Sequence, residues 1–142
     1  MLNGQLTFRY VHPLELKGYW NLVKHGVQKV TEKQHIFLVE DVYADLKSGQ
    51  ADLHLALVED DYVGFVILQK VPHHDGIALH IWMGYSVDNT KGDILTESLP
   101  ILKEWATSIN AKRLTFSSTR KGWEKNKIGW KPLHTVYSIE ME

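Results

Sequence analysis

One histidine on a predicted strand, His80, is the side chain best suited to acid–base chemistry in this sequence. Apolar and polar residues alternate over 77–83, which predicts a strand with His80 and Trp82 on one face. The other face is expected to hold the apolar side chains Ile77, Leu79, Ile81 and Met83. Only histidine has an ordinary pKa near neutrality, so His80 is predicted to act as a general base. The alternative is a half-exposed strand histidine with no catalytic role.

Other histidines raise the question of a metal site. His54 lies in a second alternating stretch, 52–58, and is expected on the same sheet face as His80. Two histidines on neighbouring strands would suit a metal ion, but no third ligand has a convincing spacing. His73, His74 and Asp75 lie at a predicted turn, which favours a solvated hairpin tip over a metal site. The sequence therefore predicts no metal centre.

Composition limits the classes of function. The 142 residues suit a single domain spanning 1–142, and sixteen basic against seventeen acidic residues argue against a general nucleic-acid binder. Because cysteine is absent, disulfides, thiolate zinc sites and a cysteine nucleophile are excluded. The chain begins without a signal-peptide pattern and has no apolar run near the roughly 20 residues of a membrane span. A cytoplasmic protein without membrane association is expected.

The hydrophobic pattern predicts strands and helices in a mixed order. Helices are expected at 14–24, ended by Gly26, at 39–46, capped by Gly49, from an N-cap within 88–90 to about 106 or 109, and at 121–127. Pro100 is expected to kink or split the third helix. Strands are expected at 6–11, 52–58, 62–70, 77–83, 113–117 and 135–139. Long helical connections between strands require a sheet that is covered on both faces.

The order of these elements resembles the GNAT superfamily of N-acetyltransferases. The ending Ile128-Gly129-Trp130-Lys131 before a last strand is similar to the closing segment of that family. The preceding block, Arg120-Lys121-Gly122-Trp123-Glu124, resembles small GNAT-like proteins encoded by bacteriophages. The resemblance implies an α/β (α+β) fold with a mixed, mainly antiparallel central sheet and helices on both faces. It also implies acetyl-CoA as cofactor and a fourth strand that splays from the fifth.

The resemblance places the coenzyme A pyrophosphate at the loop before the long helix, where Asn89, Lys91 and Gly92 would meet it. Backbone N–H groups at a helix start attract an anion, and small residues let it approach. This loop departs from the family pattern. Asn89 replaces the leading Arg or Gln, Asp93 adds negative charge, and Ile94 replaces a small residue. The loop is therefore interpreted as degenerate.

The remaining site residues also follow from the resemblance. The backbone around Met83, Gly84 and Tyr85 would orient the thioester. The family often has a tyrosine four residues before the closing glycine, as the acid that protonates the departing thiolate, and Lys125 occupies that position here. Other hydroxyl groups that would substitute for it are those of Tyr137, Ser117 and Ser118. Packing of Tyr137 in a final strand is the alternative for that residue.

Two functions are predicted from different classes. The first is transfer of acetyl from acetyl-CoA to a primary amine of a small molecule or a protein. The second is a catalytically inactive GNAT-like module that binds a protein partner, as a virion component or a modulator of a host protein, in the virion or the host cytoplasm. A nucleic-acid-binding module that uses Arg113, Arg120 and Lys121 is the third reading. A homodimer formed through edge strands is possible in either case.

Overall fold

The computed structural model describes residues 4–34, 36–87, 93–117 and 129–141. Five strands form one sheet in the order β1-β2-β3-β4-β5, antiparallel except for the parallel pair β4–β5. The strands are β1 (Leu6–Val11), β2 (Asp52–Val58), β3 (Asp61–His73), β4 (Gly76–Ser86) and β5 (Arg113–Phe116). The helices are α1 (Leu16–Gln34), α2 (Val39–Ser48) and α3 (Asp93–Ser108), with a 3-10 turn at Pro13–Glu15.

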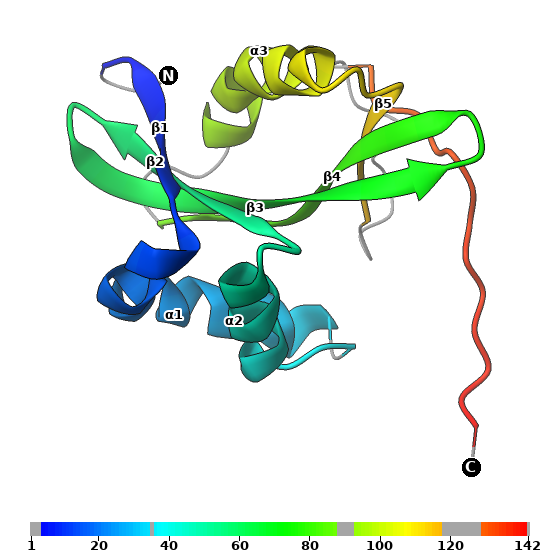
Figure 1. Cartoon of the computed structure of the whole chain (residues 1–142), viewed down its shortest axis with the longest axis horizontal. Coiled ribbons are helices and arrows are strands. Elements are labelled where there is room, and N and C mark those ends of the chain that lie inside the picture. The colour runs from blue at the N-terminus through cyan, green and yellow to red at the C-terminus, as the bar shows by residue number, and fades with distance from the viewer. Residues whose placement is uncertain (1–3, 35, 88–92, 118–128, 142) are drawn as a thin grey trace.

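Helices α1 and α2 cover one face of the sheet and α3 covers the other (Figure 1). The first face packs a large core of strand and helix side chains, in which Leu53, Ile67 and Val23 are almost fully buried. The second face packs a smaller core around Leu102 of α3. This mixed, mainly antiparallel sheet with helices on both faces confirms the predicted fold class.

Helix α1 is ten residues longer than its predicted end because Gly26 does not terminate it. A Cβ at Gly26 would lie 2.6 Å from the Tyr85 ring and 2.7 Å from the Phe65 ring. The glycine is therefore needed for close packing of the helix on the sheet. Gly49 does end α2 as predicted, with a left-handed φ of 82°.

The prediction that Pro100 splits the third helix is wrong, since α3 continues through it from Asp93 to Ser108. Pro100 is exposed, so its ring lies on the solvent side of the helix while Leu99 and Leu102 beside it are buried.

No helix in the described part of the chain combines the length and the apolar character that crossing a membrane requires.

The predicted last strand at 135–139 is also wrong. Residues 129–141, the C-terminal tail, have no regular secondary structure and run away from the sheet beyond β5 (Figure 1). The predicted helix at 121–127 lies outside the described residues. The alternating pattern that predicted the strand is present in the sequence, but the tail makes no ladder with a described strand.

Candidate active site at the fork between β4 and β5

The parallel ladder of β4 and β5 is short, and the place where it ends is called the fork below. The ladder joins Ala78–Ile81 of β4 to Arg113–Phe116 of β5 and then stops, because β5 ends at Phe116. Strand β4 continues for five more residues, to Ser86, with β3 on one side only among the described strands. Among the described residues the two strands are therefore paired only as far as Ile81 and Phe116. The carboxyl ends of strands are the usual place where an α/β sheet admits a ligand.

A β-bulge lies at the base of this fork. Ile67 of β3 pairs with Met83 and the next residue, Leu68, pairs with Ile81, so Trp82 is the extra residue of β4. A bulge leaves the extra residue outside the ladder and bends the strand. It also corrects the predicted faces, because Met83 joins the core under α1 and α2 instead of following Ile81 toward α3.

His80 lies two residues before the bulge. Its Nδ1 is 2.8 Å from Oγ1 of Thr115, directly across the parallel ladder. The flanking residues Leu79 and Ile81 pack toward α3, so His80 and Thr115 occupy the face that carries α1 and α2. Burial lowers the pKa of His80 below its ordinary value, and the nearby His73 lowers it further. His80 is therefore a neutral, half-buried imidazole, anchored at one nitrogen.

His54 lies on the opposite face of the sheet from His80, which corrects the prediction that they share a face. Its ring lies between Tyr10 and Trp105 of α3, with centroid distances of 5.4 and 4.4 Å. Burial lowers the pKa of His54 to about 4. The described residues contain no cluster of three or more histidine, cysteine or carboxylate side chains that could hold a metal ion.

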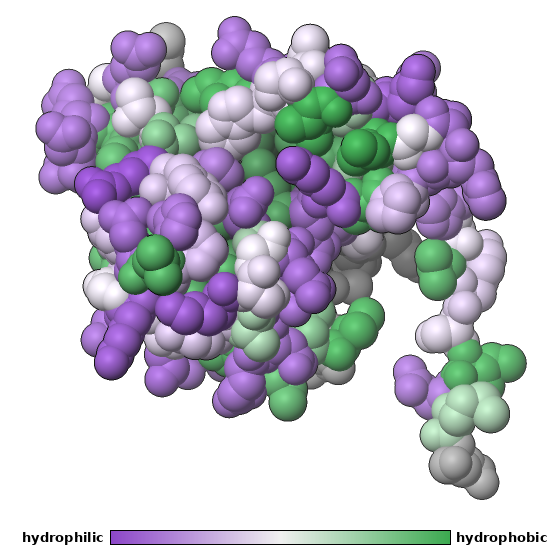
Figure 2. Space-filling view, in the orientation of Figure 1, coloured by the Kyte–Doolittle hydropathy of each residue, from purple (hydrophilic) through white to green (hydrophobic). Residues whose placement is uncertain are grey.

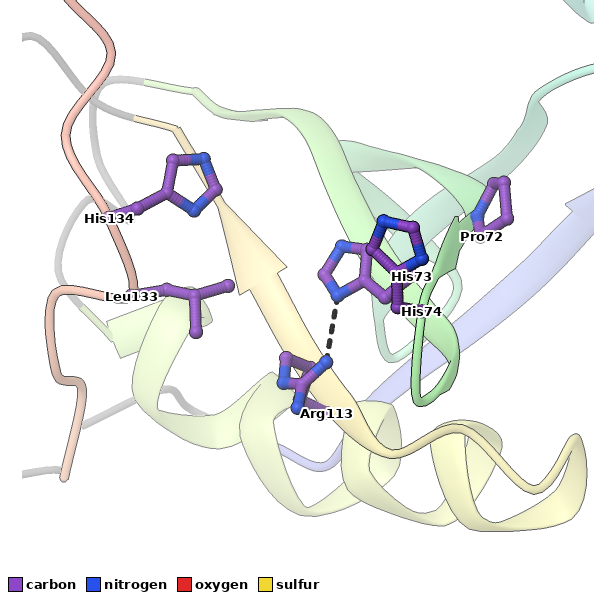
Figure 3. Close-up of a pocket in the computed structure, with 6 residues that line it drawn as sticks. All are labelled: Pro72, His73, His74, Arg113, Leu133 and His134. Atoms are coloured by element: carbon purple, nitrogen blue, oxygen red, sulfur yellow. Dashed lines mark hydrogen bonds between the residues drawn. The ribbon is translucent and has the colours of Figure 1, made fainter.

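The β3–β4 hairpin tip is tied to the start of β5. Arg113 binds both carboxylate oxygens of Asp75, one of them at 2.9 Å, and its Nη1 also donates to Nδ1 of His73 at 2.8 Å. The hydrogen bonding from Arg113 lowers the pKa of the Asp75 carboxyl. Figure 3 shows Arg113 between His73 and the tail residue Leu133, in an open pocket of about 480 Å³. Because Arg113 is paired, it is a weak candidate for the predicted nucleic-acid contact.

The other predicted site residues fall into three groups. Met83 is buried, Gly84 is exposed, and Tyr85 is half-buried against Phe65. Tyr137 lies on the C-terminal tail, where it is 88% exposed and outside any strand. The predicted residues Asn89, Lys91, Gly92, Ser118 and Lys125 lie outside the described part of the chain. The structure thus brings together His80 and the 83–85 backbone, on the same strand.

Neither Thr115 nor the bulge at Trp82 was predicted from the sequence. The only sequence signal for Thr115 is its place on a short polar–apolar strand, which gives no register for a parallel pair. The sequence cue for the bulge is Gly84, because a glycine inside a strand pattern often marks a bulge nearby.

The sequence matches no family model and no curated protein. Solved structures of acetyltransferases share the fold over almost the whole chain. A ribosomal-protein-alanine N-acetyltransferase from Brucella melitensis biovar Abortus 2308 is 16% identical, with a TM-score of 0.70 over 96% of this chain and 99% of that one. A predicted acetyltransferase from Clostridium acetobutylicum, solved with acetyl-CoA, is 13% identical, with a TM-score of 0.68 over 96% of each chain.

A third structure, an aminoglycoside acetyltransferase from an uncultured soil metagenomic sample in complex with sisomicin, is 11% identical. Its TM-score is 0.64 over 95% of this chain and 97% of that one. The chain therefore has the GNAT acetyltransferase fold. The first and third of these proteins act on chemically different acceptors, so the fold does not define an acceptor.

Proposed function

We propose that the protein is an N-acyltransferase that moves an acetyl group from acetyl-CoA to a primary amine. The observation that carries the proposal is the fork between β4 and β5, with the anchored His80 beside its base. The likeness to acetyltransferase structures, one of them solved with acetyl-CoA, supports this assignment. Acetyl transfer to an amine needs a neutral nucleophile, an oriented thioester and a proton acceptor, which is a short list for a site to supply.

The open part of β4 has room for the thioester arm of acetyl-CoA. Apart from its chain neighbours, the one described atom that a Cβ added at Gly84 would meet within 4 Å is the backbone carbonyl oxygen of Phe65, at 3.9 Å, so no described side chain crowds the strand surface there. Gly84 also lies beyond the end of the β4–β5 ladder. In the backbone around Met83 to Tyr85, the register with β3 leaves the N–H of Gly84 on the side of β5, and this group would donate to the thioester carbonyl oxygen as negative charge develops.

His80 would supply the base. If its Nδ1–H donates to Thr115 Oγ1, the lone pair remains on Nε2 and can accept a proton from the incoming ammonium group. The neutral amine then attacks the carbonyl carbon, forming the C–N bond as the C–S bond breaks. The departing thiolate takes a proton from Lys125 or Ser118, the proposed donors, and the new amide nitrogen loses its surplus proton, which restores that donor. Tyr137, on the exposed tail, is a less suitable donor. Because the pKa of His80 is lowered, it is in the neutral form required of a base at neutral pH.

Titration calorimetry with acetyl-CoA tests the proposal, with a thermal-shift measurement beside it. A ligand present at about 100 times its dissociation constant should stabilise the fold by about 2.7 kcal/mol. Binding should be followed by acetylation of one member of an amine panel, and His80→Gln should lose turnover while retaining binding. Binding without turnover on any amine would reject the transferase and leave a ligand-binding protein.

A second candidate is an inactive module that binds a protein partner, in a virion or in a host cell. The sequence observation that favours it is Ile94 at a position where the family pattern has a small residue, next to Asp93, which adds negative charge where an anion would lie. Absence of heat and of a thermal shift at millimolar acetyl-CoA would support this candidate against the first.

A further inference from the structure

A groove of about 540 Å³ lies between α1 and α2, on the solvent side of these helices. Its walls include Lys17, Trp20 and Lys24 of α1 and Glu40 and Tyr43 of α2. The buried side chains of the same helices, such as Val23 and Val42, belong to the core that packs on the sheet. Figure 2 shows a mainly hydrophilic surface over the two helices, with a few paler and green residues among the purple ones. The groove is separate from the fork, since no residue described at the fork lines it.

Two aromatic rings form the apolar part of the groove. Trp20 and Tyr43 meet edge to face, with ring centroids 4.9 Å apart and planes at 79°. Both side chains are half-buried, because they pack against the core below and still reach the groove. An aromatic side chain held in this way offers a large contact area and loses little conformational freedom on binding. The pair is therefore suited to receive a large apolar side chain.

The two walls of the groove differ in charge. Lys17 and Lys24 are exposed and make no hydrogen bond or ion pair with another described residue. They belong to a helix with four lysines and one acidic residue, Glu32. The opposite wall carries Glu40, at the start of a helix with three acidic residues and one lysine. An anionic partner therefore matches the α1 wall and must turn a neutral or basic flank toward α2.

The spacing of the α1 residues favours a helical partner. Lys17, Trp20 and Lys24 lie on one side of α1 over two turns, a rise of about 10.5 Å. A second helix in the groove has the same repeat, so residues seven positions apart can reach both lysines. In an extended chain, residues on one face repeat every ~6.7 Å, which matches this distance less closely. The groove is complementary to a helix with two acidic residues seven positions apart and an apolar residue between them.

We propose that this groove binds an acidic, amphipathic helix of a partner protein. Two carboxylates of that helix pair with Lys17 and Lys24, and an apolar side chain between them covers Trp20 and Tyr43. The apolar contact supplies most of the affinity, while the charged pairs at the rim set the orientation and the choice of partner. Binding at the groove does not depend on acetyl transfer, because the groove and the fork share no described residue.

Fluorescence anisotropy with a labelled synthetic peptide tests the proposal on the whole chain. The probe is an alanine-rich helix with glutamates seven positions apart and leucines three and four positions after the first glutamate. The control peptide has the same composition, with the second glutamate moved to the opposite face. We expect micromolar binding of the probe that weakens with added salt, and about tenfold weaker binding of the control peptide. Equal affinity for the two peptides, or no binding of the probe at millimolar protein, would overturn the proposal.

Charge reversal on α1 locates the binding site. The double variant Lys17→Glu, Lys24→Glu should bind the probe at least about tenfold more weakly than the wild-type chain, because both charged pairs become repulsive. Lys29→Glu, Lys33→Glu is the matched control, since it makes the same change of charge on the same helix outside the groove. All four lysines are exposed, and circular dichroism shows whether each variant keeps the fold. An equal loss in the two variants would reveal general attraction to a basic helix and contradict the proposal.

A charge swap separates direct pairing from other effects of the substitutions. A probe with both glutamates replaced by lysine should bind Lys17→Glu, Lys24→Glu more tightly than it binds the wild-type chain, and absence of this rescue would reject the pairing. Acetyl-CoA titration of the same variant should match the wild type, which distinguishes failure at the groove from failure at the fork. A single-stranded oligonucleotide that displaces the probe, binds more tightly and depends on Lys17 and Lys24 would identify nucleic acid as the occupant and reject a helix.

Discussion

Nδ1 of His80 and Oγ1 of Thr115 lie 2.8 Å apart across the last parallel pairs of the β4–β5 ladder. The bond joins two strands that are distant in sequence, one residue before their ladder ends. It therefore fixes the orientation of the imidazole relative to both strands at the fork. A hydrogen bond to another β4 residue would fix it relative to β4 alone. Thr115 is a positioning residue in this arrangement and His80 is the proposed base.

His80→Gln should lower kcat by about a hundredfold to ten-thousandfold, the usual contribution of a positioned base. The dissociation constant for acetyl-CoA should stay within twofold, because the side chain lies outside the open part of β4. In the wild-type protein the lowered pKa of His80 places the acid limb of kcat/KM below pH 6.5, since activity is lost as the base becomes protonated. Steady-state kinetics as a function of pH measure both effects.

Thr115→Val is the companion change to His80→Gln. Loss of one hydrogen bond of about 1.4 kcal/mol corresponds to about a tenfold lower kcat, with the base still present. The acid limb should therefore persist in Thr115→Val and be absent from His80→Gln. An unchanged pH profile in His80→Gln would show that another group is the base.

Gly84→Val should weaken acetyl-CoA binding by about tenfold or more, because the side chain would fill the open surface beside the fork. Stability should change little. A Cβ there meets no atom closer than 3.9 Å, and valine suits a strand. Calorimetry gives the affinity and denaturant unfolding gives the stability. Gly18→Ala is the control, since it also adds a side chain at an uncrowded glycine, on α1, where nothing described lies within 4 Å of the new Cβ. Equal affinities in the two variants would remove Gly84 from the binding surface.

Two glycines of the same helix should respond in opposite directions to alanine. Gly18→Ala should raise the free energy of unfolding by about 0.5–1 kcal/mol, because alanine is the better helix former and its Cβ meets nothing. Gly26→Ala should lower it by about 1–2 kcal/mol net, because the Cβ would lie 2.6 Å from Tyr85 and 2.7 Å from Phe65. Those rings stack on each other at 5.6 Å, so neither can retreat alone. Stabilisation by both substitutions would contradict this packing.

The sequence allowed prediction of most elements but not of the details that make the fork. Alternation over 52–58 located β2 correctly because one face of that strand is buried in a contiguous core. The same rule placed Met83 on the wrong face, because a bulge at Trp82 shifts every later residue by one position. Such a bulge depends on pairing with β3 and leaves little trace in β4 alone.

Two further wrong predictions, the helix end at Gly26 and the last strand, have a common physical cause. Gly26 was expected to end a helix and instead provides room for two aromatic rings from the sheet. These rings belong to distant residues, so the sequence around Gly26 does not reveal them. The tail carries a valid strand pattern, but a strand forms only where another strand offers its edge. Contacts between distant segments decided both cases, as they also brought Thr115 to His80.

His54 should make the protein less stable in acid. Its folded-state pKa is about 4 against an ordinary value of 6.5, because burial disfavours the charged ring. Between these values the unfolded chain binds more protons than the folded one, so the free energy of unfolding falls as pH drops. The full contribution is present above pH 6.5 and is lost progressively toward pH 4, by up to about 3 kcal/mol.

His54→Phe should remove this pH dependence while keeping a ring between Tyr10 and Trp105. Denaturant unfolding at pH 7, 6, 5 and 4.5 measures it for the variant and the wild-type protein. The difference between the two chains isolates His54, because the lowered pKa of His80 and the raised pKa of Asp52 act on both. His74→Phe, at an exposed position on the hairpin tip, is the control and should follow the wild-type curve. Parallel curves for His54→Phe and the wild type would mean that the folded protein accommodates a charged imidazole against Trp105.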